Sequence, residues 1–394
     1  MNITVIGCGR WGSFHAWHAN KIGHAVTLYG RKNSATMERL ERTGGNDYLT
    51  LSKEIRLTRD LADAVNFADV IIISIGSQNL RGLLNEIKIC GASLDGKKFL
   101  LCMKGLERGT GKRLTTIFNE VINGQTSDEL SAFGRDVVTN ERVDELSGIF
   151  DGDAKNSLDE LTPLKDGDFP AAQNFPTVFN EVINQSRDNL QSPSSNSSVK
   201  HVAVWVGPGH VEDFVNEIPN CMVIASADEK FSRELAEIFK SPLIRFYYST
   251  DLIGTEFGAA TKNVVGIAAG MLDGLNRSCL KGALMARGAA EFSRLISALG
   301  GDKMTVYGLS HLGDYEATLF SAHSRNRMFG ESFVHKKIFD KPAEGVDTVA
   351  ALMKLSEATG VELPISRAVY EIIFDGREPS EQLTKLFLRP TKAE

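Results

Sequence analysis

The stretch that decides the fold is residues 3–12, which read Ile3-Thr4-Val5-Ile6-Gly7-Cys8-Gly9-Arg10-Trp11-Gly12. An apolar, β-branched run leads directly into a GxGxxG loop, and a helical pattern follows over residues 13–21. In this context Gly7 permits a tight turn, Gly9 lets a pyrophosphate approach the backbone, and Gly12 lets the helix pack closely. An ordinary glycine turn is the competing interpretation, but strand, loop and helix agree on a dinucleotide-binding unit.

Similar apolar runs recur along the chain and alternate with helical stretches in its first half. They lie at residues 25–29, 70–74, 99–102, 202–206, 222–225 and 244–248. Such alternation predicts a parallel sheet with helices on both faces. From residue 250 onward, Ala-, Leu- and Gly-rich helical patterns replace the strands. We therefore predict an α/β fold, in which a doubly wound Rossmann-type parallel sheet, residues 1–250, is followed by an all-helical C-terminal domain, residues 251–394.

The bulk composition points to a cytoplasmic enzyme with a small-molecule substrate. Of the 394 residues, 42% are hydrophobic and 24% are charged, as in ordinary globular proteins. The five cysteines are scattered and lack the paired spacing of a zinc site, so we expect no metal. Neither a signal peptide nor a membrane-spanning run occurs, and no long basic run favours nucleic acid. We therefore expect no membrane or nucleic-acid partner.

Residues 124–198 fit neither domain pattern. Residues 126–198 contain 14 Asp and Glu against 5 Lys and Arg, a net charge of −9, whereas the rest of the chain carries +3. The segment is also rich in Asn and Ser, which is typical of disordered sequence. We interpret it as a disordered insertion on the surface, and a regulatory or partner-binding arm is the alternative.

The end of the second predicted strand bears on which cofactor is preferred. NAD-binding folds often place an acidic residue there to bind the ribose, but the sequence reads Leu28-Tyr29-Gly30-Arg31-Lys32. A cation at this position favours the 2′-phosphate of NADP, and Arg31 is the better candidate because its guanidinium can bind phosphate through two donors. The alternative is that both cations are simply solvated, so the cofactor is NADP or NAD.

Five further motifs follow the glycine loop in order. They are Lys104-Gly105-Leu106-Glu107, Gly207-Pro208-Gly209-His210, Gly258-Ala259-Ala260-Thr261-Lys262-Asn263, Leu309-Ser310-His311-Leu312-Gly313-Asp314 and Ser324-Arg325-Asn326-Arg327. Together they resemble the NAD(P)-dependent glycerol-3-phosphate dehydrogenase family over nearly the whole chain outside residues 124–198. The resemblance implies a homodimer that reversibly reduces dihydroxyacetone phosphate to sn-glycerol 3-phosphate for glycerophospholipid synthesis.

The resemblance also implies roles for the matching residues. Lys262 matches the family's proton donor, and burial in an apolar helix is expected to lower its pKa towards neutrality. An isolated lysine would more often reach solvent from such a helix. The substrate-binding residues implied are Lys104, Gly207, Asn263, Asp314, Thr318, Ser324, Arg325 and Asn326. The cofactor-binding residues implied are Gly7, Gly9, Arg10, Trp11, Gly12, Arg31, Lys104, Val211, Arg325 and Glu344.

One departure and two alternative functions accompany this interpretation. Gly209 and His210 stand where the family usually has a hydroxyl residue and an aromatic, so a hydroxyl contact is lost. A hydroxyacid or ketopantoate reductase would share the glycine loop and a lysine, but would not require Ser324-Arg325-Asn326. A nucleotide sensor that has lost turnover is the second alternative, and the intact Lys262 and Asp314 disfavour it.

Overall fold

The computed structural model describes residues 1–125 and 200–391. The predicted disordered insertion lies outside these residues except for Gly124 and Gln125. Eight strands form one sheet in the order β3-β2-β1-β4-β5-β6-β7-β8. Their bounds are β1 Asn2–Ile6, β2 Ala25–Tyr29, β3 Arg56–Thr58, β4 Val70–Ile73, β5 Lys98–Leu101, β6 Val202–Val206, β7 Asn220–Ala225 and β8 Ile244–Ser249.

The predicted sheet is confirmed, except that β7 and β8 run in the direction opposite to the other strands. Every neighbouring pair is parallel except β6 and β7, which are antiparallel. Antiparallel strands need only a short connection, and residues 207–219 between them contain only one short helix, Val211–Val215. The sheet is therefore mixed and mostly parallel. Strand β3 was not predicted, because its three residues, Arg56-Leu57-Thr58, are largely polar.

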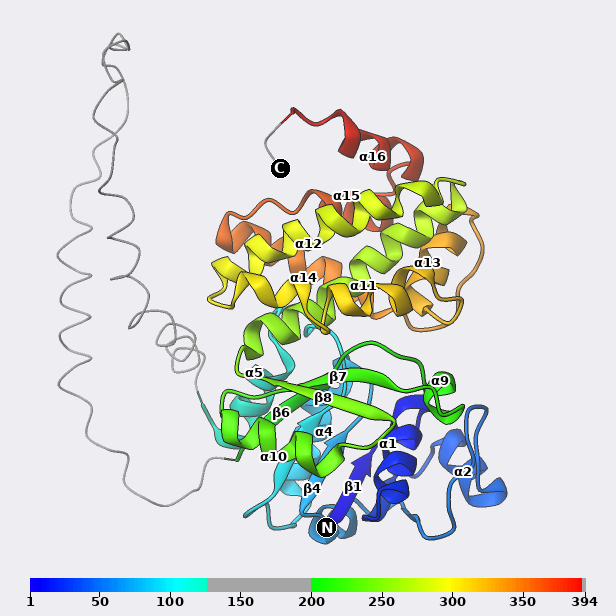
Figure 1. Cartoon of the computed structure of the whole chain (residues 1–394), viewed down its shortest axis with the longest axis vertical. Helices are drawn as coiled ribbons and strands as arrows, with labels where there is room; N and C mark the ends of the chain where they lie inside the picture. The colour runs from blue at the N-terminus through cyan, green and yellow to red at the C-terminus, as the bar shows by residue number, and fades with distance from the viewer. Residues whose placement is uncertain (126–199, 392–394) are drawn as a thin grey trace, which may run out of the picture. The chain divides into compact units, whose positions relative to one another are not determined.

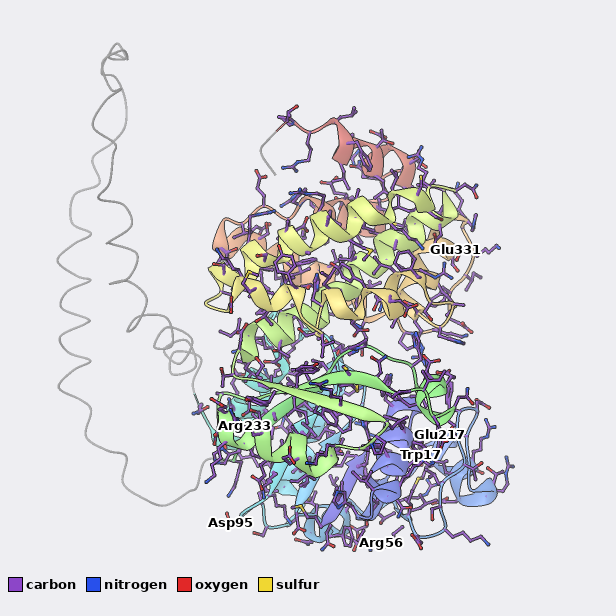
Figure 2. The ribbon with its side chains drawn as sticks, in the orientation of Figure 1. Trp17, Arg56, Asp95, Glu217, Arg233 and Glu331 are labelled. Carbon is purple, nitrogen blue, oxygen red and sulfur yellow. The ribbon has the colours of Figure 1, made fainter. Side chains whose placement is uncertain are left out.

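Helices cover both faces of the sheet (Figure 1). One apolar core joins the sheet to α1 Arg10–Lys21, α2 Ala35–Thr43, α9 Val211–Val215 and α10 Glu229–Phe239. The other joins it to α3 Leu61–Phe67, α4 Leu80–Ile89 and α5 Leu114–Phe118. The strands are buried on both faces as a result, which explains their almost uninterrupted apolar sequence. Charged side chains such as Arg56, Asp95 and Arg233 lie on the outer surface (Figure 2).

After β8 the described chain contains only helices and turns, as predicted. The helices are α11 Leu252–Gly274, α12 Lys281–Ala298, α13 Arg325–Val334, α14 Glu344–Thr359, α15 Pro364–Phe374 and α16 Pro379–Lys385. Helix α11 packs against α12, α13, α14 and α15, which explains why nearly all of its residues are buried. Among the described residues, no helix is both long and apolar enough to cross a membrane.

Glycines allow the close packing around α11. A Cβ on Gly270 would lie 1.9 Å from the carbonyl oxygen of Arg327, and one on Gly266 would lie 2.8 Å from the methyl group of Thr318. Larger residues at these positions would push α13 and the turn that carries Thr318 away from α11. A small apolar cluster of Val206, Val223 and Ala259 then joins α11 to the carboxyl-end region of the sheet. The functional residues of both parts meet there.

Candidate active site

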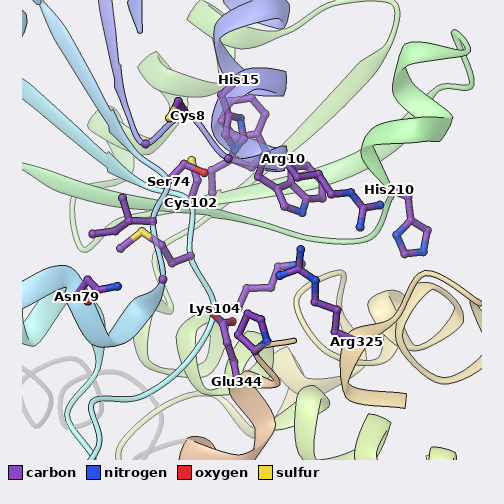
Figure 3. A pocket seen from close by; sticks show the side chains of 18 of the residues that line it. Cys8, Arg10, His15, Ser74, Asn79, Cys102, Lys104, His210, Arg325 and Glu344 are labelled. Carbon is purple, nitrogen blue, oxygen red and sulfur yellow. The ribbon is translucent and has the colours of Figure 1, made fainter. Parts of the chain in front are cut away.

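A single cavity of about 610 Å³ collects most of the predicted site residues (Figure 3). This volume is typical of a small-molecule or cofactor site. The predicted residues that line it are Gly7, Gly9, Arg10, Trp11, Arg31, Lys104, Lys262, Asn263, Asp314, Thr318, Ser324, Arg325, Asn326 and Glu344. Residues from the first strand and residues beyond 320 therefore share one cavity.

Three predicted residues do not line the cavity. Gly12 packs against Gly7, the Val211 side chain is fully buried in an apolar core, and Gly207 meets Lys104 through its carbonyl oxygen. Gly12 is needed for packing, because a Cβ there would lie 1.7 Å from the carbonyl oxygen of Gly7. Any contact of Val211 with a ligand must therefore come from its backbone.

The glycine loop fits a dinucleotide. Gly7 has a φ of 112°, and a Cβ on it would lie 2.2 Å from the carbonyl oxygen of Ser74. In contrast, a Cβ on Gly9 would meet nothing within 4 Å, so the space beside its backbone is open. Helix α1 begins directly after Gly9, and the first N–H groups of a helix have no partner within it. Open space beside free N–H donors suits a pyrophosphate.

The residues after β2 line the cavity with a second group of polar side chains. Arg31 lies there with Ser34 and Thr36, which the sequence analysis did not single out. The Arg31 guanidinium is exposed, and its ion pair with Glu86 is long, at 4.0 Å. Arg59 stabilises this loop by donating to the carbonyl oxygens of Arg31 and Lys32. Lys32 does not line the cavity, so the structure separates the two cations that the sequence placed side by side.

The catalytic candidates converge on one carboxylate. Oδ2 of Asp314 accepts from Nζ of Lys262, and also from Nζ of Lys104 at 2.7 Å. Lys262 further donates to Oγ1 of Thr318 at 3.1 Å, and Lys104 to the carbonyl oxygen of Gly207 at 2.9 Å. Lys262 is 4% exposed and Asp314 is 1% exposed. Two ammonium groups thus share one buried carboxylate at the wall of the cavity.

Burial controls the proton affinity of Lys262. Loss of solvent lowers the pKa of Lys262 to about 7, and the positive charge of Lys104 acts in the same direction. The carboxylate of Asp314 opposes both effects, because a negative charge favours the ammonium form. A lysine with a pKa near neutrality can both donate and accept a proton under physiological conditions. The structure therefore places a suitable acid or base beside the open cavity.

A buried pair that the sequence analysis overlooked holds the turn that carries Asp314. The Tyr315 hydroxyl lies 2.6 Å from Nε2 of His311, and Nδ1 of His311 lies 2.9 Å from the carbonyl oxygen of Gly258 on α11. Burial lowers the pKa of His311 to about 4, so its ring adds no positive charge beside Lys262. These contacts link the turn to α11 one helical turn before Lys262.

The motif Ser324-Arg325-Asn326 opens α13. Ser324 caps the helix, since its hydroxyl accepts from the N–H of Arg327 at 3.4 Å, and its own hydrogen remains free to donate. Oδ1 of Asn326 accepts from the N–H of Gly345 at 2.9 Å, which leaves the amide NH₂ as a donor. Arg325 makes no hydrogen bond or ion pair within the described residues and points into the cavity (Figure 3). Three donors therefore remain for an anion.

Glu344 lines the same cavity from the first turn of α14. Burial raises the pKa of Glu344 to about 7. A hydrogen bond from the backbone of Ser77 and the positive charges of Lys104 and Arg325 lower this pKa, but burial has the larger effect. At neutral pH its carboxyl group is therefore protonated more readily than that of an exposed glutamate. A partly neutral acid in a cavity with several cations suits a contact to a ligand amide or hydroxyl.

Known proteins resemble this chain along its whole length. The family model of the NAD-dependent glycerol-3-phosphate dehydrogenase N-terminus matches residues 2–132, and that of the C-terminus matches residues 251–384. A glycerol-3-phosphate dehydrogenase [NAD(P)+] from Prosthecochloris aestuarii is 31% identical over 100% of both chains.

Solved structures share the fold. A glycerol-3-phosphate dehydrogenase from Coxiella burnetii has a TM-score of 0.74 at 21% identity, with 98% of this chain and 99% of that chain covered. A ketopantoate reductase from Ralstonia eutropha has a lower TM-score, 0.51, at 14% identity, covering 97% of this chain and 100% of that chain. The family models and the full-length relative agree with the motifs in the cavity: the chain belongs to the NAD-dependent glycerol-3-phosphate dehydrogenase family.

Proposed function

We propose that this chain reversibly reduces dihydroxyacetone phosphate to sn-glycerol 3-phosphate with NAD(P)H, and that Lys262 moves the proton. The observation that carries the proposal is the pair of ammonium groups, Lys104 and Lys262, on the carboxylate of Asp314 within the cavity. The nicotinamide, when bound, supplies the hydride for the carbonyl carbon of the substrate. What remains for the protein is to bind and orient the substrate and to protonate its oxygen.

Lys262 acts on the C2 oxygen of the substrate. In the reducing direction its ammonium polarises the carbonyl and then protonates the developing alkoxide. In the oxidising direction its neutral amine accepts the proton of the C2 hydroxyl. A pKa of about 7 makes both forms accessible near neutral pH. Asp314 and Thr318 keep Nζ of Lys262 in place for this transfer, since both accept hydrogen bonds from it.

The substrate phosphate binds at the start of α13 in this proposal. Arg325 supplies the charge, and Ser324 and Asn326 supply neutral donors beside it. Lys104 and Asn263 complete the substrate contacts from the neighbouring walls of the cavity. A ketone that lacks a phosphate would leave Arg325 without a partner, so the site selects a phosphorylated substrate.

The cofactor extends from the glycine loop to the nicotinamide end near Lys104 and Glu344. We assign its diphosphate to Gly7, Gly9 and the start of α1, and Gly12 contributes by packing closely against Gly7. Arg31, with Ser34 and Thr36 beside it, would bind a 2′-phosphate, so NADP is favoured over NAD.

The cellular setting is also part of the proposal. We place the enzyme in the cytoplasm as a homodimer that supplies glycerol 3-phosphate for phospholipid synthesis. Family resemblance supports the dimer. Large apolar side chains at the helical end also remain exposed to solvent, as expected of a surface that contacts a second copy: Phe374, Phe387 and Leu388 are 47% to 76% exposed. We further assign residues 1–250 to cofactor binding and residues 251–394 to substrate binding. The second family model, which begins at residue 251, agrees with this division.

Replacing Lys262 by methionine tests the proposal. Methionine keeps the length of the side chain but removes the proton, so the rate of NAD(P)H oxidation with dihydroxyacetone phosphate should fall by about a thousandfold. Lys97→Met is the matched control, because burial also lowers the pKa of Lys97. This lysine directly precedes β5, at the end of the strand that lies away from the cavity. That variant should keep its rate. A wild-type protein that binds NAD(P)H but does not oxidise it with this substrate would refute the activity.

A further inference from the structure

Two buried nitrogen atoms at one end of the cavity have no hydrogen-bond partner among the described residues. They are Nε of Arg10 and Nε2 of His210, and both residues line the cavity. The ring nitrogens of His15, another residue of the cavity, also lack partners, but that ring packs against Trp205. Figure 3 shows the Arg10 guanidinium beside the His210 ring. A buried polar group without a partner costs about 1–3 kcal/mol, so native structures rarely keep one unless a ligand or water satisfies it. The two nitrogens therefore indicate a ligand atom at this place.

The surrounding charges indicate what kind of atom it is. Arg10 forms an ion pair with Glu212, and the unpaired Arg325 lines the same cavity. Burial is the main reason why the pKa of His210 is lowered, and the charges of Arg10 and His323 lower it further. The carboxylates of Asp213 and Glu212 act in the opposite direction. His210 is therefore neutral at physiological pH, and a neutral imidazole still offers one N–H donor. N–H donors beside Arg10, in a cavity that the unpaired Arg325 also lines, select an anionic acceptor.

The His210 ring packs against the ring of His323. The two ring centroids lie 5.5 Å apart in an edge-to-face arrangement, which is a favourable aromatic geometry. His323 directly precedes Ser324, which caps α13 at the proposed phosphate site. The ring of His210 therefore lies where the start of α1, next to the glycine loop, and the start of α13 approach each other.

We infer that His210 is a phosphate-binding residue, whose Nε2–H donates to a phosphate oxygen of a bound ligand. This inference rests on the proposed function, which supplies two phosphate groups with the same chemistry. One is the phosphomonoester of the substrate, and the other is the diphosphate of the cofactor.

The test compares His210→Phe with His210→Gln. Phenylalanine keeps the ring against His323 but removes the donor, whereas glutamine restores an N–H at a similar reach. His210→Phe should raise one Michaelis constant by about tenfold with kcat nearly unchanged, as expected for a lost hydrogen bond to a charged group. His210→Gln should recover most of that loss. His201→Phe is the control, since His201 is exposed and does not line the cavity.

Two measurements identify the phosphate that His210 binds. A higher KM for dihydroxyacetone phosphate, with weaker competitive inhibition by inorganic phosphate, assigns His210 to the substrate. A higher Kd for NADPH in the absence of substrate, measured by nucleotide fluorescence, assigns His210 to the cofactor. The inference is overturned if both constants stay within twofold of wild type in His210→Phe, or if His210→Gln is as impaired as His210→Phe. Wild-type turnover in the same assay keeps this result separate from failure of the proposed function.

Discussion

The two halves of the cavity are built in opposite ways. On the sheet side, backbone and missing side chains shape the site: Gly7 and Gly12 leave room for other backbone atoms, and Gly9 leaves room for a ligand. On the helical side, buried charges shape it: Lys262 and Asp314 meet with almost no exposure to solvent. Adding atoms should therefore damage the first half, whereas removing charge should damage the second.

Asp314→Asn should have the largest effect on the helical side. An amide cannot compensate two ammonium groups, so kcat should fall by about a thousandfold. Asp273→Asn is the matched control, because Asp273 is a carboxylate on α11 that pairs with Lys281 and Arg327 outside the cavity. The control should lower Tm while kcat stays within about threefold. Equal losses of kcat in the two variants would show that the carboxylate acts only through stability.

Gly12→Ala should have the next largest effect, now on the sheet side. The new methyl group would lie 1.7 Å from the carbonyl oxygen of Gly7, so the variant should lose about 3 kcal/mol or more of unfolding free energy. Gly9→Ala places its methyl group in open space, so it should keep its Tm and lose only affinity for NAD(P)H. Denaturant unfolding and nucleotide titration check the two results. A stable Gly12→Ala variant would contradict the packing role of this glycine.

Arg31→Ser should have a smaller and more selective effect. Loss of the guanidinium should raise KM for NADPH by about tenfold and leave KM for NADH nearly unchanged, because only NADPH carries a 2′-phosphate. Lys32→Ser provides the comparison, since Lys32 does not line the cavity. Steady-state kinetics with both cofactors would decide between the two cations. Equal changes in both Michaelis constants would show that Arg31 does not select the cofactor.

The same contrast explains what the sequence could predict. The glycine loop is local, so strand, turn and helix were readable from residues 3–21. Buried parallel strands such as Val70–Ile73 were evident from composition, whereas the direction of β7 was not, because composition does not encode strand direction. On the helical side the family motifs identified Lys262 and Asp314. Their meeting depends on contacts between residues more than fifty positions apart.

Other contacts in the site could not be predicted from the motifs. The link from Tyr315 through His311 to α11 and the contact between His210 and His323 join residues whose types are common in other roles. Val211 matches a family position, yet its side chain faces the core. A motif thus located a position but could not tell a backbone contact from a side-chain contact. Only the packing of the folded chain separates the two.

The central claim is that Lys262 carries the proton, and the pH dependence of kcat/KM in both directions tests it most directly. Reduction needs the ammonium, so its kcat/KM should fall as the pH rises through about 7; oxidation needs the neutral amine, so its kcat/KM should fall as the pH drops through the same value. Glu344 also has a pKa of about 7, so the profiles are repeated with Glu344→Gln. The predicted result is that the two profiles remain opposite in this variant. Profiles whose inflection near pH 7 disappears in Glu344→Gln would contradict the account.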